Sequence, residues 1–233
     1  MPEHWRIHVV VFDLDDTLYA ERDYVISGFA AVDRWLVANR GVKGFYARAQ
    51  VLFSSGHRVK IFDKVLEQLG LSVIPSQIAE LVEVYRQHVP ALHLFPDAET
   101  ALEQIGKDYQ LGLITDGYRV SQEKKIAALG LAARIPCRIV TDALGREFWK
   151  PSLEPYRRVM AYYGGEAEDF VYVADNPRKD FIGARQLGWR TVRIRRPGCE
   201  HSEYEPTGEE SADAEIPSLP ELMPLMVPAR CEG

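Results

Sequence analysis

Acidic residues gather directly behind the first apolar run of the chain, in the stretch VVFDLDDTLY. They are Asp13, Asp15 and Asp16. Carboxylates held close together repel one another, and a divalent cation with oxygen ligands is a common compensation. Magnesium is the usual cytosolic choice, and it is typically held by one or two carboxylates together with water and substrate phosphate. These residues therefore predict a magnesium site.

Polar residues also follow three later apolar segments of the chain. They are Thr115, Asp116 and Gly117 after residues 111–114, Lys150 after residues 138–140, and Asp175, Asn176 and Asp180 after residues 170–174. In a parallel α/β sheet the ligand site lies beyond the carboxyl ends of the strands, so we expect these side chains to converge. The Thr115 hydroxyl, the Lys150 ammonium and the N–H groups at Gly117 would form a cradle for a phosphate group.

The segments that precede these residues are apolar or rich in β-branched residues, as buried strands are. We expect strands at residues 7–12, 111–114, 138–140, 170–174 and 191–194, and helices at 120–129, 153–163 and 178–187. A last strand at 214–216 and a helix at 218–226 would close the fold. The alternation of strand and helix predicts the α/β class, with a doubly wound parallel sheet.

Roughly 95 residues separate the first expected strand from the second, where a simple crossover needs far fewer. Helical periodicity runs through this gap, with apolar residues at Phe62, Val65, Leu66 and Leu69. The gap therefore predicts a small all-helical domain at residues 20–92. The α/β domain would then comprise residues 1–19 and 93–233.

Composition excludes several other classes of protein. The net charge of −6, without a cluster of basic residues, excludes an electrostatic footprint for nucleic acid. The three cysteines Cys137, Cys199 and Cys231 are widely spaced, which predicts reduced thiols and neither disulfides nor a zinc site. No signal peptide and no apolar run long enough to span a membrane is present, so we expect a cytoplasmic protein. Nothing in the sequence indicates an oligomeric state.

Four stretches together resemble the motifs of the haloacid dehalogenase-like hydrolases. They occur in the family's order: DLDDT, then LITDG, then Lys150 followed by Pro151, then VADNPRKD. The resemblance covers about 160 residues of the α/β core, and the helical insertion matches the family's cap between the first and second motifs. Ala174 stands where the family often has glycine. Asp16 does so too, and we expect its side chain to stabilise a turn.

The resemblance implies a role for each matching position. Asp13 would attack phosphorus and form an aspartyl-phosphate, and Asp15 would act as general acid and then as general base. Thr115, Asp116, Gly117 and Lys150 would bind the phosphate. Asp13, the carbonyl oxygen of Asp15, and Asp175 would hold magnesium, supported by Asn176 and Asp180.

Residues near and within the helical insertion are candidates for contact with substrate. Glu21, Arg22 and Tyr24 lie where the chain enters the insertion, and His57 and Arg58 follow a glycine inside it. A solvated loop between helices explains His57 and Arg58 equally well.

The predicted function is a magnesium-dependent phosphatase that hydrolyses a small phosphomonoester, so the expected partner is a phosphorylated metabolite. A phosphosugar mutase similar to β-phosphoglucomutase uses the same intermediate and is the main alternative. A receiver-type signalling phosphoprotein fits less well, because its phosphorylated aspartate would follow the third strand. A haloacid dehalogenase needs no magnesium, which would leave Asp15 and Asp175 without a role.

Overall fold

The computed structural model describes residues 4–228, and the chain divides into two compact units. The first unit joins Met1–Glu21 to His93–Gly233, and the second comprises Arg22–Leu92. The helical periodicity of the sequence predicts the inserted segment at residues 20–92. In the described part of the chain, no helix is long and apolar enough to cross a membrane.

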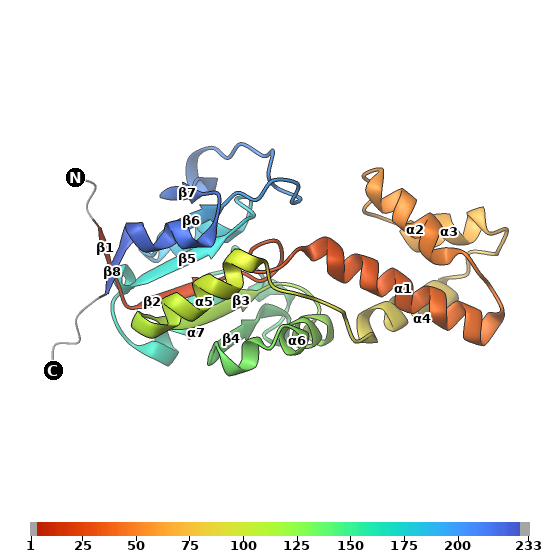
Figure 1. Ribbon diagram of the computed structural model, residues 1–233, viewed down its shortest axis with the longest axis horizontal. Coiled ribbons are helices and arrows are strands. Elements are labelled where there is room, and N and C mark those ends of the chain that lie inside the picture. Colours follow the sequence, from red (N-terminus) through yellow and green to blue (C-terminus); the bar gives the residue numbers. More distant parts are fainter. Residues whose placement is uncertain (1–3, 229–233) are drawn as a thin grey trace. The chain divides into compact units, whose positions relative to one another are not determined.

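The first unit is built on a six-stranded parallel sheet (Figure 1). Its strands, in chain order, are β2 (Val9–Phe12), β3 (Gln110–Thr115), β4 (Cys137–Val140), β5 (Phe170–Ala174), β6 (Arg190–Ile194) and β7 (Ala214–Ile216). Their order across the sheet is β4-β3-β2-β5-β6-β7, and every neighbouring pair is parallel. The predicted doubly wound parallel sheet is confirmed.

Helices connect these strands and cover the sheet. They are α5 (Pro96–Asp108), α6 (Arg119–Ala128), α7 (Glu154–Tyr163) and α8 (Asp180–Gln186). Short 3₁₀ helices lie between them: η1 (Leu131–Ala133), η2 (Thr141–Ala143), η3 (Arg146–Phe148), η4 (Ala167–Asp169), η5 (Gly208–Glu210) and η6 (Leu219–Leu225). Tyr156 and Val159 of α7 and Phe181 of α8 pack with Val9 and Val11 of β2 in one core cluster, which places α7 and α8 on the same face of the sheet. Right-handed crossovers put α5 and α6 on the opposite face.

The register of the strands explains why the polar residues that follow them meet. Phe12 of β2 lies opposite Leu113 of β3 and Val173 of β5, so the three central strands end at nearly the same level. The Asp13 N–H then donates to the Val173 carbonyl at 2.9 Å, which continues the pairing one residue beyond β2. Side chains after β2, β3 and β5 therefore emerge at one edge of the sheet.

Two terminal elements differ from the sequence prediction. The expected first strand is divided: β1 (Trp5–Ile7) pairs in parallel with β8 (Met226–Pro228), and β2 begins only at Val9. Hydrophobicity cannot reveal this change of partner, because Ile7 and Val9 are both fully buried. The expected helix at 218–226 is the 3₁₀ helix η6 followed by β8. Pro224 lies inside η6 and has no N–H to donate, which disfavours an α-helix there.

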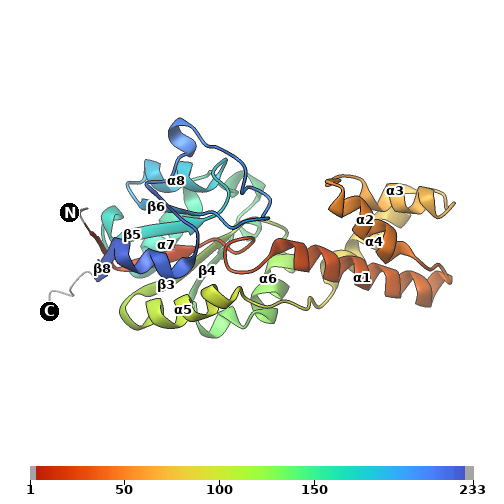
Figure 2. The ribbon, with the colours of Figure 1, turned by 45° about the horizontal axis from the view of Figure 1, so that its top comes forward.

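The second unit is helical (Figure 2). Its helices are α1 (Glu21–Arg40, whose first residue belongs to the first unit), α2 (Phe45–Ser54), α3 (Ile61–Gln68) and α4 (Pro75–Gln87). One apolar cluster, which includes Phe29, Phe45 and Leu66, forms its core. A Cβ atom at Gly28 would overlap the ring of Tyr85, so this glycine permits close packing of α1 against α4.

Candidate active site

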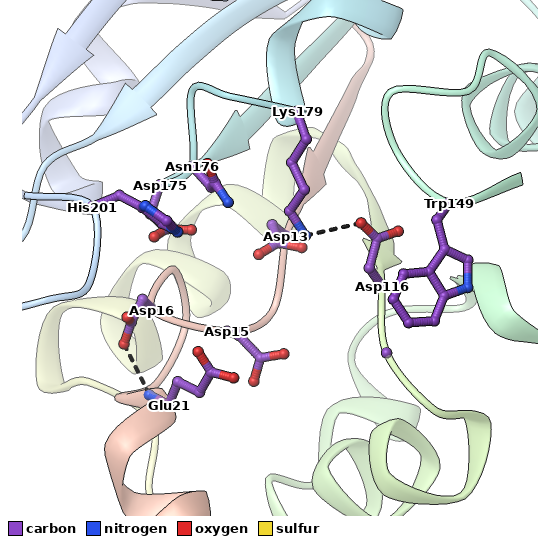
Figure 3. Close-up of a pocket in the computed structure, with 11 residues that line it drawn as sticks. Asp13, Asp15, Asp16, Glu21, Asp116, Trp149, Asp175, Asn176, Lys179 and His201 are labelled. Carbon is purple, nitrogen blue, oxygen red and sulfur yellow. Dashed lines mark hydrogen bonds and ion pairs between the residues drawn. The ribbon is translucent and has the colours of Figure 1, made fainter. Parts of the chain in front are cut away.

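An acidic cavity lies at the carboxyl edge of the sheet (Figure 3). It is lined by Asp13, Asp15, Asp16, Glu21, Asp116, Gly117, Trp149, Asp175, Asn176, Lys179 and His201. Its volume of about 160 Å³ is below the roughly 300–1,000 Å³ of sites that enclose a drug-sized ligand. The cavity therefore suits an ion and a small group such as phosphoryl.

Lys150 lies between two buried carboxylates behind the cavity. Its Nζ atom is 2.6 Å from Asp13 Oδ1 and 2.6 Å from Asp180 Oδ1, and it donates to the Tyr172 hydroxyl at 2.9 Å. Burial raises the pKa of Asp13 to about 7, although the charge of Lys150 opposes this rise. Burial acts to lower the pKa of Lys150, but the charges of Asp13 and Asp180 raise it well above its usual value. The lysine ammonium is therefore charged, and it lies against the first acid of the DLDDT stretch.

Three carboxylates from two strand ends and one helix start form a group that fits a divalent cation. Asp13, Asp175 and Asp180 each offer one oxygen, and these oxygens lie within 4.8 Å of one another. Burial, followed by the charges of Asp180 and Asp13, raises the pKa of Asp175 well above its usual range. A bound cation would relieve the repulsion among these three carboxylates, and oxygen ligands suit magnesium. The residues present therefore fit the expected ion.

Asp180 is held in place at the start of α8. Its Oδ2 atom accepts the Asn176 N–H at 3.1 Å, and the Asn176 side chain in turn accepts the Arg178 N–H at 3.1 Å. The loop after β5 is thus tied to the helix that follows it, which orients Asp175 at its start.

The residues after β3 are arranged around a network of hydrogen bonds. Thr115 is fully buried, and its hydroxyl accepts from Gln122 Nε2 at 2.5 Å. The Asp116 carboxylate accepts from the Thr141 hydroxyl at 2.8 Å, the Lys150 N–H at 3.1 Å and Lys179 Nζ at 2.9 Å. Burial acts to raise the pKa of Asp116, but Lys150 and Lys179 lower it overall. This carboxylate therefore fastens three segments around the cavity, and it remains negatively charged.

Gly117 follows Asp116 with a φ angle of +126°, a backbone conformation that side chains rarely adopt. A Cβ atom there would also lie 3.1 Å from the Gln122 side chain. Glycine keeps this part of the cavity wall open ahead of α6.

Asp15 is surrounded by hydrogen-bond donors. Lys125 Nζ donates to Oδ1 at 2.7 Å, the Tyr19 hydroxyl also donates to Oδ1, and Gln122 Nε2 donates to Oδ2 at 2.9 Å. Burial acts to raise the pKa of Asp15, but the charge of Lys125 and these hydrogen bonds lower it overall. Glu21 lies on the same side of the cavity, and burial and the charge of Asp15 raise the pKa of Glu21 to about 7.

Asp16 stabilises the turn after β2, as its sequence position predicted. Its φ angle is 52°, in the left-handed region. Its Oδ1 accepts the Glu21 N–H at 2.9 Å and its Oδ2 accepts the Glu200 N–H at 3.2 Å. The turn prediction is confirmed.

The candidates around the helical insertion have different surroundings. Glu21 lines the cavity, whereas Arg22, Tyr24, His57 and Arg58 belong to the second unit. Within that unit, Tyr24 is buried, and its ring packs against the rings of Tyr85 at 5.5 Å and His88 at 5.0 Å.

His57 and Arg58 make local contacts in the second unit. His57 Nδ1 lies 3.2 Å from the Ser55 hydroxyl, and the Arg58 guanidinium stacks over the Phe53 ring at 4.3 Å. Arg58 also donates to the Phe53 carbonyl at 2.8 Å. These contacts are of the kind that close a helix end.

Several residues of the cavity were not anticipated from the sequence. Trp149, Lys179 and His201 line it, and Gln122 and Lys125 lie beside it, where they donate to Asp15. Gln122 and Lys125 are three residues apart, so they lie on one face of the helix that follows Gly117, and this spacing was a readable signal. Lys179 lies within the VADNPRKD stretch itself. For Trp149 and His201, which lie in long loops, the sequence offers no comparable pattern.

The described cysteines are not paired. Burial raises the pKa of Cys137 to about 11 and that of Cys199 to about 12, so both are thiols at neutral pH. Cys231 lies outside the described residues.

Comparisons with known proteins agree on one family. The family described as haloacid dehalogenase-like hydrolase matches residues 10–194. A glyceraldehyde 3-phosphate phosphatase of Methanopyrus kandleri is 29% identical over 231 residues, which cover 94% of this chain and 97% of the relative.

Solved structures share the fold. The 2-haloacid dehalogenase of Pseudomonas syringae superposes with a TM-score of 0.65 and 26% identity, over 94% of this chain and 97% of that protein. The HAD-hydrolase YfnB of Bacillus subtilis, solved with magnesium bound, superposes with a TM-score of 0.67 and 19% identity, over 95% of this chain and all of that protein.

Proposed function

The chain belongs to the haloacid dehalogenase-like hydrolases, and we propose that it is a magnesium-dependent phosphatase that acts on a small phosphomonoester through an aspartyl-phosphate at Asp13. The observation that carries the proposal is the placement of Asp13. Its carboxylate contacts Lys150 on one side, shares a candidate cation site with Asp175 and Asp180, and lines the same cavity as Asp15.

The first half of the reaction forms the bond to Asp13. A carboxylate oxygen of Asp13 attacks phosphorus while the bond from phosphorus to the ester oxygen breaks. Asp15 gives its proton to the departing ester oxygen, so that an alcohol leaves. The phosphate dianion of the substrate brings negative charge next to Asp15, which favours the protonated carboxyl at this stage.

The second half returns the enzyme to its starting state. Asp15, now a carboxylate, accepts a proton from a water molecule as that water attacks phosphorus. The bond between phosphorus and Asp13 breaks, and inorganic phosphate leaves. One carboxyl group thus serves as acid and then as base.

Binding of the transferred group falls to the residues around Asp13. Thr115, Lys150 and the backbone N–H groups at Asp116 and Gly117 surround the phosphoryl oxygens. The Asp116 side chain does not take part directly, because its carboxylate is occupied by Thr141, Lys179 and the Lys150 N–H. Lys150 supplies positive charge where charge develops in the transition state.

Asp13, Asp175 and the carbonyl oxygen of Asp15 would hold the magnesium ion, with Asp180 behind them and Asn176 supporting the loop. When bound, the ion neutralises negative charge on the phosphoryl group. The group of buried carboxylates supports this assignment.

The helical unit, residues 22–92, is assigned as the family's cap domain. It is inserted between the DLDDT and LITDG stretches, and the chain enters it directly after Glu21. Cap domains of this kind admit substrate and then exclude bulk water during attack. The choice of substrate is expected to depend on this unit, and the relative from M. kandleri, named a glyceraldehyde 3-phosphate phosphatase, makes triose phosphates the first group to test.

The test measures release of inorganic phosphate from glyceraldehyde 3-phosphate, phosphoserine, several sugar phosphates and p-nitrophenyl phosphate. Wild type, Asp13→Asn and a control, Asp108→Asn, are assayed with magnesium and with a chelator. Asp108 is an exposed carboxylate at the end of α5. The proposal expects release that needs both magnesium and Asp13 and that Asp108→Asn leaves unchanged.

Three outcomes would contradict the proposal. Undiminished release by Asp13→Asn would exclude the aspartyl-phosphate. Halide release from a 2-haloacid, without phosphate release from any ester, would instead support dehalogenase chemistry. Transfer of phosphate between positions of a hexose phosphate, faster than its release, would favour the mutase.

A further inference from the structure

Three donors from two parts of the chain converge on the Asp15 side chain. Lys125 and Gln122 come from α6, and Tyr19 comes from the loop after β2. Lys125 and Gln122 are almost fully buried, with relative exposures of 4% and 1%. Nothing in the proposed chemistry uses Lys125 directly, so its burial against Asp15 needs an explanation of its own.

Burial of the Lys125 ammonium group costs free energy, which its contacts must offset. Removing an ammonium group from water costs several kcal/mol unless the charge is paired. Here its Nζ atom is 2.7 Å from Asp15, and this pair joins α6 to the loop that carries the first motif. The contact spans 110 positions of sequence, so it depends on the assembled fold.

The two oxygens of Asp15 are not equivalent. Oδ1 accepts from both Lys125 and Tyr19, which occupies its lone pairs. Oδ2 accepts from Gln122, and its second lone pair remains for a proton. Asp15 lines the cavity, so the oxygen that can carry a proton is Oδ2.

Gln122 links this arrangement to the phosphate cradle. Its Nε2 atom donates to Asp15 Oδ2 at 2.9 Å and to the Thr115 hydroxyl at 2.5 Å. The distance between the proton-carrying oxygen and the hydroxyl assigned to phosphate is thus fixed by one side chain. A general acid must lie within hydrogen-bond reach of the leaving oxygen, and this link maintains that distance.

We propose that Lys125 is a positioning residue for the general acid: together with Tyr19 it holds Oδ1 of Asp15, so that Oδ2 presents the proton to the ester oxygen. The inference rests on the proposed phosphatase function. Lys125 does not touch the reacting atoms and does not transfer a proton. Its effect therefore falls on the steps in which Asp15 transfers a proton. The value of kcat/KM isolates the first of them, protonation of the leaving group, because it does not include hydrolysis of the aspartyl-phosphate.

The dependence of kcat/KM on the leaving group gives a clear signature. An alkyl phosphate has a basic leaving oxygen that needs a proton, whereas p-nitrophenolate leaves as an anion. General acid catalysis contributes roughly 10²–10⁴-fold where it is needed. Lys125→Met should therefore lower kcat/KM by about 10–100-fold for glycerol phosphate, within that range, and by less than about 3-fold for p-nitrophenyl phosphate.

The experiment measures kcat and KM for these two substrates, and compares kcat/KM, in wild type, Asp15→Asn, Lys125→Met and the double variant. Lys124→Met, one position away on α6, is the control for loss of a lysine from this helix. The proposal expects Lys125→Met to show the substrate pattern of Asp15→Asn and to add almost nothing in the Asp15→Asn background. Lys125→Arg, which keeps the charge, should restore part of the loss for glycerol phosphate.

Two further measurements guard against a loss of folding. Thermal unfolding reports whether Lys125→Met is folded, and vanadate binding reports whether the phosphate cradle is intact. If that variant does not fold, Tyr19→Phe removes one donor to Oδ1 without removing volume, and it should show the same substrate pattern at smaller amplitude.

Equal losses of kcat/KM for both substrates, or losses that multiply with those of Asp15→Asn, would overturn the proposal, as would an unchanged kcat/KM for glycerol phosphate. Failure of the proposed function is distinguishable, because wild type would then release no phosphate from either substrate.

Discussion

Replacing Lys150 with methionine removes an ammonium group from between two buried carboxylates. Asp13 and Asp180 each lie 2.6 Å from Lys150 Nζ, and the side chains of Lys150 and Asp180 have no exposed surface. Methionine fills a similar volume, so the main effect is electrostatic. The carboxylates then face one another without the cation that separates them.

Two calculations agree on the size of this effect. Truncating one partner of a buried ion pair costs about 3–5 kcal/mol of the free energy of unfolding. Alternatively, the folded variant avoids the repulsion between these carboxylates if one more of them takes up a proton. With an ordinary pKa of 3.8, this costs about 4 kcal/mol at pH 7, at about 1.4 kcal/mol per pH unit. We therefore expect Lys150→Met to lose about 4 kcal/mol in the presence of a chelator.

The assay is equilibrium unfolding in urea, with chelator and with magnesium. Magnesium should recover part of the loss, because the ion supplies positive charge to the same carboxylates. Lys179→Met is the control: its partner Asp116 keeps two other donors, and a third of the Lys179 side chain is exposed. Its loss should be about 1 kcal/mol. A Lys150→Met protein within about 1 kcal/mol of wild type in chelator would refute this reasoning.

Three other perturbations test separate parts of the structure. The raised pKa of Glu21, about 7 against an ordinary 4.5, means that the folded protein binds a proton more tightly than the unfolded chain, so wild-type stability should fall as pH rises from about 4.5 to 7. Glu21→Gln should show a smaller fall in urea titrations with chelator, because Asp13, whose pKa is also about 7, contributes over the same range, and an unchanged pH dependence would show that the Glu21 carboxyl does not contribute. Magnesium binding near pH 6 should release protons, because burial and neighbouring charges raise the pKa values of Asp13 and Asp175. Calorimetry in two buffers of different ionisation enthalpy measures this release, and identical heats would contradict it. Gly28→Ala should destabilise the protein by about 1–3 kcal/mol in urea, because its methyl group would overlap the Tyr85 ring, and an unchanged midpoint would mean that the ring can move aside.

The α/β core was predictable because its signals are local. Near-continuous apolar strands such as Phe170–Ala174 indicate a sheet covered on both faces, and polar residues directly after them mark its carboxyl edge. That rule alone predicts that Asp13 and Asp175 lie close together. The register of the strands sets the level at which these residues emerge.

What could not be predicted depends on contacts between distant parts of the chain. From the sequence, Lys125 is predicted to be a surface lysine of an amphipathic helix, and only the fold shows that it contacts Asp15. The pairing of β1 with β8 could not be predicted either, because the hydrophobicity of Ile7 does not indicate which strand it pairs with. The direction in which a side chain points also cannot be predicted from the sequence. The Asp116 carboxylate turns toward Lys179, a role that its place in the LITDG stretch does not reveal.

The central claim is that Asp13 carries the phosphoryl group during turnover. The most direct measurement uses Asp15→Asn, which lacks the base that activates water and should therefore accumulate the intermediate. The protein is mixed with magnesium and p-nitrophenyl phosphate, quenched in acid, reduced with borohydride and analysed by peptide mass spectrometry. Reduction of an aspartyl-phosphate should convert Asp13, and no other residue, to homoserine. Conversion of a different carboxyl, or phosphate release by wild type with Asp13 never modified, would contradict the claim.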